Sequence, residues 1–112
     1  MQKTTKSKDA VWISFDLGVQ GDYEGLYRWL DEYDAEECGD SVAFLNYEHT
    51  GDLRESLRKS IKVSVEINNR SRIYVVHEEE GKIRGKFIIG SRKRPAWSGY
   101  AVKQGQGEDS SA

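Results

Sequence analysis

Near the N-terminus, apolar and polar side chains alternate strictly, and this pattern constrains the fold more than any other feature of the chain. Over residues 11–17 the odd positions are all apolar, whereas Trp12, Ser14 and Asp16 occupy the even ones. A period of two is that of a β-strand, whose successive side chains point to opposite faces of a sheet. The chain is therefore expected to fold around a sheet with one apolar face, and Gly18 is expected to end this strand.

Two segments have the spacing of helices. After Asp22, a good N-cap, apolar residues recur every three or four positions as far as Tyr33. Gly25 inside this helix costs roughly 1 kcal/mol relative to alanine, which indicates a close backbone approach. A second helix is expected after Asp52, which has an acidic residue three positions later. Its apolar side consists of Leu53, Leu57 and Ile61, and its C-terminal end is ambiguous.

The remaining apolar segments have the character of strands. They are residues 35–38 (weak), 41–47, 72–77 and 82–89, with a two-residue turn at 39–40 and a last extended segment at 96–102. The order predicts an α+β fold, a ferredoxin-like βαββαβ sandwich with an extra C-terminal strand and both helices on one sheet face. The domain is expected to span residues 10–103, between disordered tails at 1–9 and 104–112.

The opposite face of the predicted sheet has no helix to cover it. It is expected to carry Trp12, Ser14 and Asp16 of the first strand. The basic residues of the last strand are expected to join them; these are Lys82, Arg84 and Lys86. An exposed tryptophan on an open sheet favours cover by another molecule, and a homodimer is the simplest cover.

Composition excludes several classes of protein. The 112 residues suffice for one domain, and the net charge of −2 argues against a uniformly basic molecule. No apolar run approaches the roughly 18 residues of a membrane span, and the N-terminus lacks the apolar stretch of a signal peptide. Cys38 is the only cysteine, so an intramolecular disulfide is impossible. We therefore expect a cytoplasmic protein with no membrane contact.

The small net charge hides a strong segregation. Residues 16–55 contain 12 acidic and 2 basic residues, a balance of −10, whereas residues 57–103 contain 12 basic and 4 acidic residues, a balance of +8. Surfaces of opposite sign could pair between subunits, or the basic one could bind a polyanion. Alternatively, the fold mixes the two halves in space.

Asp16 is the strongest candidate for chemistry. A single carboxylate cannot hold Mg²⁺ firmly, but a two-fold axis could supply a second one. The alternative is that Asp16 closes the strand and pairs with a basic residue or a loop amide. His49 and His77 are far apart in the sequence and lack a neighbouring cysteine or second histidine, so we expect them to be structural. Cys38 is expected to be a small packing residue.

A run of bases and aromatic residues follows the last long strand. Arg92, Lys93 and Arg94 precede a proline, and Trp97 and Tyr100 come shortly after it. Such a run can bind phosphates and stack on bases, so these residues are predicted to bind DNA or RNA together with Lys82, Arg84 and Lys86. The alternative is a solvated turn followed by a strand that packs its own tryptophan.

Two motifs resemble a known family. The first strand ends in Phe15-Asp16-Leu17, and the next helix begins Asp22-Tyr23-x-x-Leu26-Tyr27. With residues 40–44, they look like the SinR-like family, which is similar to VapD and to the small CRISPR adaptation protein. The resemblance covers about residues 11–90. It implies a ferredoxin-like homodimer in which the aspartate that closes the first strand lies near the dimer axis and binds a divalent metal. Only Asp16 matches that role, and the chain continues further than the family pattern, with a basic turn of its own.

These observations lead to two hypotheses. The first is a nucleic-acid-associated homodimer of the SinR/VapD type, which is either a Mg²⁺-dependent endonuclease acting through Asp16 or an inactive relative. The second is a protein-interaction module, such as an antitoxin-like or regulatory subunit, without catalytic activity. Because one carboxylate stands beside many bases, the sequence favours binding over catalysis.

Overall fold

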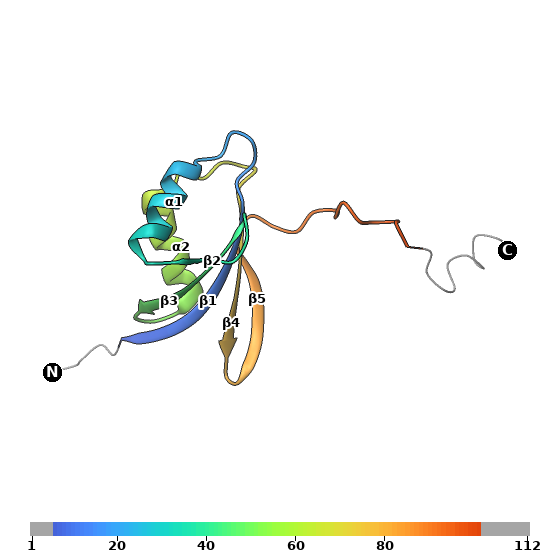
Figure 1. The fold of residues 1–112 in the computed structure, drawn as a ribbon. Helices are drawn as coiled ribbons and strands as arrows, with labels where there is room; N and C mark the ends of the chain where they lie inside the picture. Colours follow the sequence, from blue (N-terminus) through green and yellow to red (C-terminus); the bar gives the residue numbers. More distant parts are fainter. Residues whose placement is uncertain (1–5, 102–112) are drawn as a thin grey trace.

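Two helices pack on one face of a five-stranded antiparallel sheet in the computed structural model, which describes residues 6–101 (Figure 1). The class predicted from the sequence, α+β, is confirmed. The strands are β1 (Ser7–Asp16), β2 (Glu36–Glu37), β3 (Val42–His49), β4 (Arg72–Glu79) and β5 (Lys82–Ile89). The helices are α1 (Tyr23–Glu32) and α2 (Leu53–Ser64). Neither helix in this part of the chain is long and apolar enough to cross a membrane.

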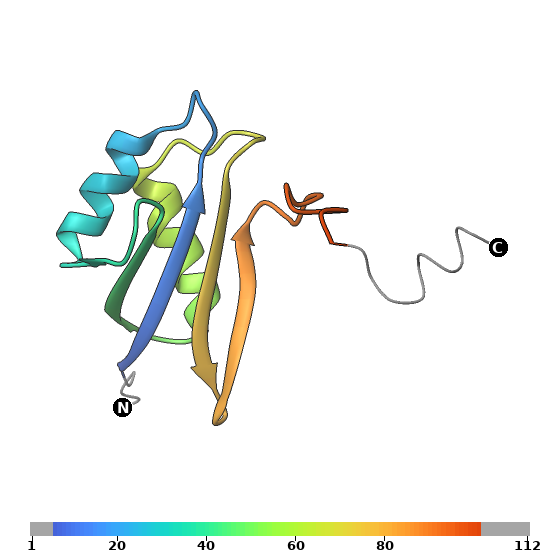
Figure 2. The ribbon, with the colours of Figure 1, turned by 45° about the vertical axis from the view of Figure 1, so that its right-hand side comes forward.

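The first strand lies at the centre of the sheet. The order across the sheet is β2-β3-β1-β4-β5, and all neighbouring strands are antiparallel (Figure 2). In this register Trp12 lies between Phe44 of β3 and Val76 of β4. Asp16 lies opposite Arg72 at the end of β1. The loops that follow β1 and precede β4 therefore meet at one end of the sheet.

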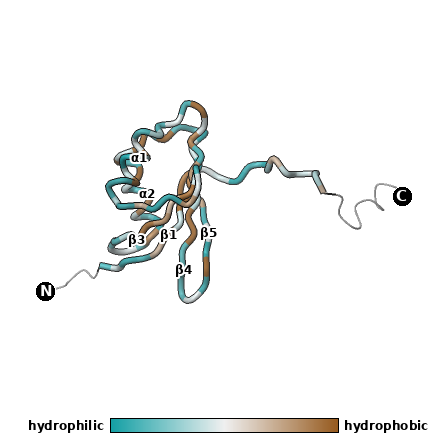
Figure 3. The backbone as a smooth tube through the Cα atoms, in the orientation of Figure 1, coloured by the Kyte–Doolittle hydropathy of each residue, from teal (hydrophilic) through white to brown (hydrophobic). Residues whose placement is uncertain are grey.

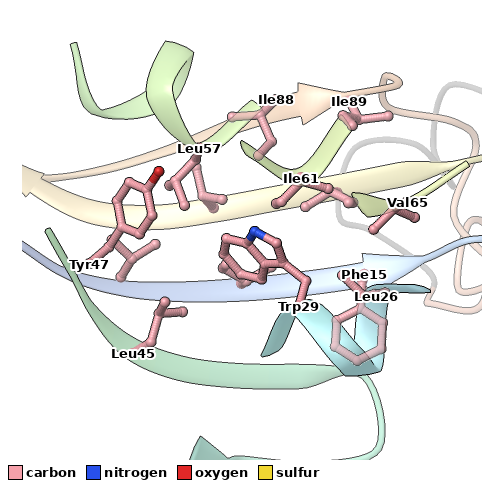
Figure 4. Packing of buried hydrophobic residues seen from close by; sticks show 14 of the residues in the cluster. Phe15, Leu26, Trp29, Leu45, Tyr47, Leu57, Ile61, Val65, Ile88 and Ile89 are labelled. Atoms are coloured by element: carbon pink, nitrogen blue, oxygen red, sulfur yellow. The ribbon is translucent and has the colours of Figure 1, made fainter. Parts of the chain in front are cut away.

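The predicted alternation of β1 is confirmed, because Val11, Ile13 and Phe15 are buried beneath the helices. Hydrophobic residues recur along the other long strands as well (Figure 3). The predicted apolar side of α2 is also buried, whereas α1 contributes Leu26 and Trp29 (Figure 4). The apolar positions expected in this helix were Tyr23, Leu26, Tyr27, Leu30 and Tyr33, a set that omits Trp29. Its indole Nε1 donates a hydrogen bond to Ser60 Oγ at 2.9 Å, which ties α1 to α2.

Asp22 and Gly25 control how closely the helices approach each other. The Asp22 carboxylate accepts from the Gly25 amide at 3.0 Å and from the Glu66 amide, beyond α2, at 2.9 Å. A Cβ atom on Gly25 would lie 2.6 Å from the carbonyl oxygen of Ser64 at the end of α2. The close approach predicted at Gly25 is therefore confirmed. Asp52 caps α2 in the same way, accepting from the Glu55 amide at 2.9 Å.

Several expected boundaries need correction. β1 begins at Ser7, because its first residues pair with the end of β3, so residues 7–9 belong to the strand rather than to a tail. β2 contains only two residues, and residues 38–41 connect it to β3 instead of a two-residue turn. Residues 96–99 form turns rather than a strand. The predicted tail at 104–112 lies outside the described residues.

The largest correction concerns β5. Lys82, Arg84 and Lys86 pair with Glu79, His77 and Val75, two of which are buried on the helix side. Residues that pair across neighbouring strands share a face of the sheet. The three bases therefore lie on the helix side at the sheet edge, and not on the open face. Alternation alone separates two sets of side chains, but only the register assigns each set to a face.

Candidate functional site

The Asp16 carboxylate is held at the end of β1 by two hydrogen-bond donors. Arg72 Nη2 donates to Asp16 Oδ2 at 3.1 Å, and the Gly18 amide donates to Oδ1 at 3.1 Å. The hydrogen bond from Arg72 is the main reason why the pKa of Asp16 lies below its ordinary value, and the Gly18 amide adds to the effect. Asp16 is therefore ionised at neutral pH and already paired with a base.

This environment does not match a divalent metal site within one chain. Both carboxylate oxygens of Asp16 already accept hydrogen bonds. Within residues 6–101, no group of three or more Asp, Glu, His and Cys side chains is placed to bind a cation. The geometry is that of the alternative interpretation, a strand-end carboxylate paired with a base and a loop amide. The predicted Mg²⁺ role would need carboxylates from a second molecule.

Basic side chains from separate segments surround a hollow beside Asp16. Its volume is about 340 Å³, and its lining comes from the end of β1 and the start of β4 and from the loops that follow β1, precede β4 and follow β5. Four lining residues are bases, Arg70, Arg72, Arg92 and Lys93, which we call the strand-end cluster. Among the described residues, Asp16 is the only acidic one in the lining. The hollow therefore carries an excess of positive charge, which favours an anion.

A second hollow, of about 300 Å³, adjoins the first on the open face of the sheet. The two share Asp16, Arg72 and Arg92 as lining residues. Tyr74 and Phe87 line the second hollow, with their ring centroids 4.8 Å apart in an edge-to-face arrangement. The Arg92 guanidinium carbon lies 5.9 Å from the Tyr74 centroid and 5.7 Å from that of Phe87. At these distances a guanidinium is attracted to an aromatic ring.

Two more aromatic rings continue this surface across β1 and β3. The Trp12 and Phe44 centroids are 4.8 Å apart, and Trp12 is 42 % exposed on the open face, as the alternation of β1 predicted. We refer to Trp12, Phe44, Tyr74 and Phe87 together as the aromatic platform. The sequence had not grouped these residues, because their proximity depends on the pairing of four strands. The only local indication in the sequence that these residues share a face was that they occupy alternate positions along their strands.

The residues predicted to bind nucleic acid lie in three separate places. Arg92 and Lys93 join the strand-end cluster. The three bases of β5 face the helix side, near an ion pair between Arg54 and Glu79 at 3.7 Å. Arg94 and Trp97 belong to the segment that runs away from the sheet after β5, and Trp97 is 75 % exposed (Figures 1 and 2). The structure therefore adds Arg70 and Arg72 to the predicted set and separates the β5 bases from it.

Acidic residues gather at the opposite edge of the sheet. A hollow of about 360 Å³ lies between α1 and the β2–β3 connection, and its acidic lining residues are Asp31, Glu36, Glu37 and Asp40. Phe15, which precedes Asp16 on β1, also lines this hollow, but its acidic residues come from α1 and the β2–β3 segment, on the other side of β1 from Arg72 of β4. The charge segregation along the sequence therefore persists in space at these two sites.

The other candidate side chains have local partners. The His49 ring nitrogen Nε2 lies 2.7 Å from Asp9 Oδ2, and His49 is buried against the core. His77 is buried on β4, where its Nδ1 lies 3.3 Å from the Glu78 carbonyl oxygen. Cys38 is exposed, so its predicted packing role is wrong. The residue lies in the connection after β2, where the core does not reach.

Comparison with known proteins adds no relative. No family model, no curated protein and no solved structure matches the chain. The predicted similarity to the SinR-like family therefore still depends on the two sequence motifs alone.

Proposed function

We propose that this chain is a nucleic-acid-associated protein that binds the phosphate backbone through its strand-end cluster. The observation that carries the proposal is the hollow of about 340 Å³ in which four bases face a single carboxylate. Guanidinium groups match the geometry of phosphate oxygens, and three of the four bases are arginines. Binding needs no further chemistry, so the proposal does not include cleavage.

The negative net charge of the molecule does not oppose this proposal. Fields near a protein surface depend on local charges, because salt screens interactions beyond about 8 Å at physiological ionic strength. The carboxylates of the acidic hollow come from α1 and the β2–β3 segment, whereas the described residues that line the basic hollow include one carboxylate, that of Asp16. A phosphate at the cluster therefore experiences mainly Arg70, Arg72, Arg92 and Lys93.

We propose further that the fold is ferredoxin-like with one extra strand, and that the protein is cytoplasmic. The order β2-β3-β1-β4, with all neighbours antiparallel and both helices on one face, supports the fold assignment, and β5 is then the addition. The single, exposed Cys38 agrees with a reducing compartment. Neither statement is needed for the binding proposal.

The salt dependence of binding tests the proposal. Fluorescence anisotropy would follow a labelled oligothymidylate of about 12 nucleotides, beginning at about 50 mM salt. Each neutralised phosphate of a single strand contributes about −0.7 to the slope of log K against log salt. Four contacts would therefore give a slope of about −2.8, and the double variant Arg92→Gln/Lys93→Gln should bring it to about −1.4.

A matched variant separates location from total charge. Lys82→Gln/Arg84→Gln also removes two positive charges, but from exposed positions of β5 on the helix side. We expect the slope of this variant to stay within about 0.5 of wild type, because screening weakens distant charges. Absence of binding at about 50 mM salt, or equal effects of both double variants, would contradict the proposed site.

The open face supports a second candidate, a homodimer or protein-interaction module. Trp12 is 42 % exposed and contacts Phe44, so the centre of the face is apolar. A specific interface of ordinary size should survive at about 100 μM, where light scattering would detect a dimer. Trp12→Glu should then give a monomer. If the wild type is itself a monomer at this concentration, the dimer proposal is wrong and the face is free for another ligand.

A further inference from the structure

The two hollows together have the layout of a single nucleotide site. One is lined by the strand-end cluster and suits a phosphate, and the other is lined by Tyr74 and Phe87. Arg72 and Arg92 line both. A phosphate and the base attached to the same sugar must lie in neighbouring places of different chemistry, and this pair of hollows provides them.

The Tyr74 ring lies along the surface of the sheet. A Cβ atom on Gly85 would lie 2.8 Å from Cζ of Tyr74 and 2.9 Å from its Cε2, so the ring lies across β5 over this glycine. Phe87 stands edge-to-face against it. A ring that lies along a sheet can present a face to an incoming base, and every base can stack on such a face.

We infer that the open face of the sheet binds single-stranded nucleic acid by stacking bases on the aromatic platform while the strand-end cluster holds a phosphate. The inference depends on the proposed function and specifies its substrate. Tyr74 and Phe87 form the first stacking position, beside Arg92. Trp12 on β1 and Phe44 on β3 form a second position. Its centre lies two strand spacings, or about 10 Å, from the centre of the first position.

A duplex does not fit this arrangement. Its bases already stack on each other and expose only their edges in the grooves, whereas a single strand can splay its bases onto protein rings. The platform is a face of aromatic side chains with few hydrogen-bonding groups, so we expect weak dependence on base sequence. RNA and DNA share the required chemistry of phosphate and base, and separate probes distinguish them.

The test compares the affinities of single and double strands for platform variants. The probes are a labelled oligothymidylate, an oligouridylate and a duplex, each of about 12 nucleotides or base pairs, at about 50 mM salt. Wild type should prefer both single strands to the duplex. Tyr74→Leu and Phe87→Leu should each weaken single-strand binding by roughly 5-fold to 150-fold, the range that corresponds to the loss of one base stack, and change duplex binding less than about two-fold.

Two further variants keep the test decisive. Tyr27→Leu removes a tyrosine that is 52 % exposed on α1, on the other side of the sheet, and should leave all affinities unchanged. Trp12→Leu changes the most exposed ring of the platform and tests the second position even if a variant of the half-buried Tyr74 fails to fold. Circular dichroism would verify the fold of each protein.

The outcomes separate the inference from the proposed function. If the probes bind with a steep salt dependence but the platform variants match wild type within about two-fold, stacking is wrong and the phosphate-binding function stands. Duplex binding equal to or tighter than single-strand binding would also overturn the inference. If none of the probes binds, the proposed function itself is wrong. Tighter binding of oligouridylate than of oligothymidylate would assign the site to RNA.

Discussion

Replacing Gly25 with alanine would test how closely the two helices approach each other. The added methyl carbon would lie 2.6 Å from the backbone carbonyl oxygen of Ser64 and would also contact the Asp22 carboxylate. Ordinary contact begins near 3.5 Å, so the helices must separate by roughly 0.9 Å. Overpacking of this kind costs about 1–3 kcal/mol, and the better helix propensity of alanine offsets about 1 kcal/mol. We expect Gly25→Ala to lower the free energy of unfolding by up to about 2 kcal/mol.

Urea denaturation followed by circular dichroism measures this change. With a slope m of about 1.5 kcal/mol/M, the midpoint should fall by up to about 1.3 M while m stays constant. Lys59→Ala, at an exposed position of α2, is the control and should stay within about 0.5 kcal/mol of wild type. If Gly25→Ala is instead about 1 kcal/mol more stable, propensity outweighs the contact and the argued close packing is wrong.

Three other predictions follow from the described contacts. Trp29→Phe removes the indole hydrogen bond to Ser60 and should lower the free energy of unfolding by about 1–2 kcal/mol; a change under about 0.5 kcal/mol would contradict this. Hydrogen bonding, chiefly to the Glu66 amide, lowers the pKa of Asp22 below 3.8. The ionised Asp22 carboxylate therefore stabilises the fold above pH 3.8, and this stabilisation is lost as the pH falls through the lower pKa of the folded state. In urea denaturation, the free energy of unfolding of Asp22→Asn should therefore fall less on acidification than that of wild type. Asp16→Asn should bind oligothymidylate about two- to five-fold more tightly, with or without a chelator, because it removes a negative charge beside the phosphate. Weaker binding, or a requirement for Mg²⁺, would instead support a metal role for Asp16.

Local patterns predicted both helices and the four long strands, but not the boundaries of β2, and the strand expected at 96–102 is replaced by turns at 96–99. Asp22 and Asp52 cap helices as expected, since the carboxylate and the free amides that it accepts from are within three residues of each other. The alternation of β1 likewise predicted which of its side chains are buried. The expected boundaries were wrong where pairing with a distant strand extends an element, as at Ser7, which lies opposite His49.

The candidate site was predicted only in part. Asp16 and the exposed Trp12 follow from the period of a single strand, and Arg92 and Lys93 stood out as a basic run. Arg72 was not singled out, because nothing near it in the sequence indicates that it would pair with Asp16, 56 residues away. The metal interpretation of Asp16 considered its carboxylate without this partner.

The sequence by itself determined the helix starts and the buried face of β1, because each depends on residues within a few positions of one another. It also indicated the close approach at Gly25, because a glycine inside a helix occupies a position where other residues are favoured. Only the tertiary structure decided which way β5 faces. A strand with period two has two equivalent assignments, and the pairing of Val75 with Lys86 selects one of them. The same pairing places Phe87 beside Tyr74 and brings Arg92 to Arg72, so both the strand-end cluster and the aromatic platform arise from contacts between strands that no local pattern encodes.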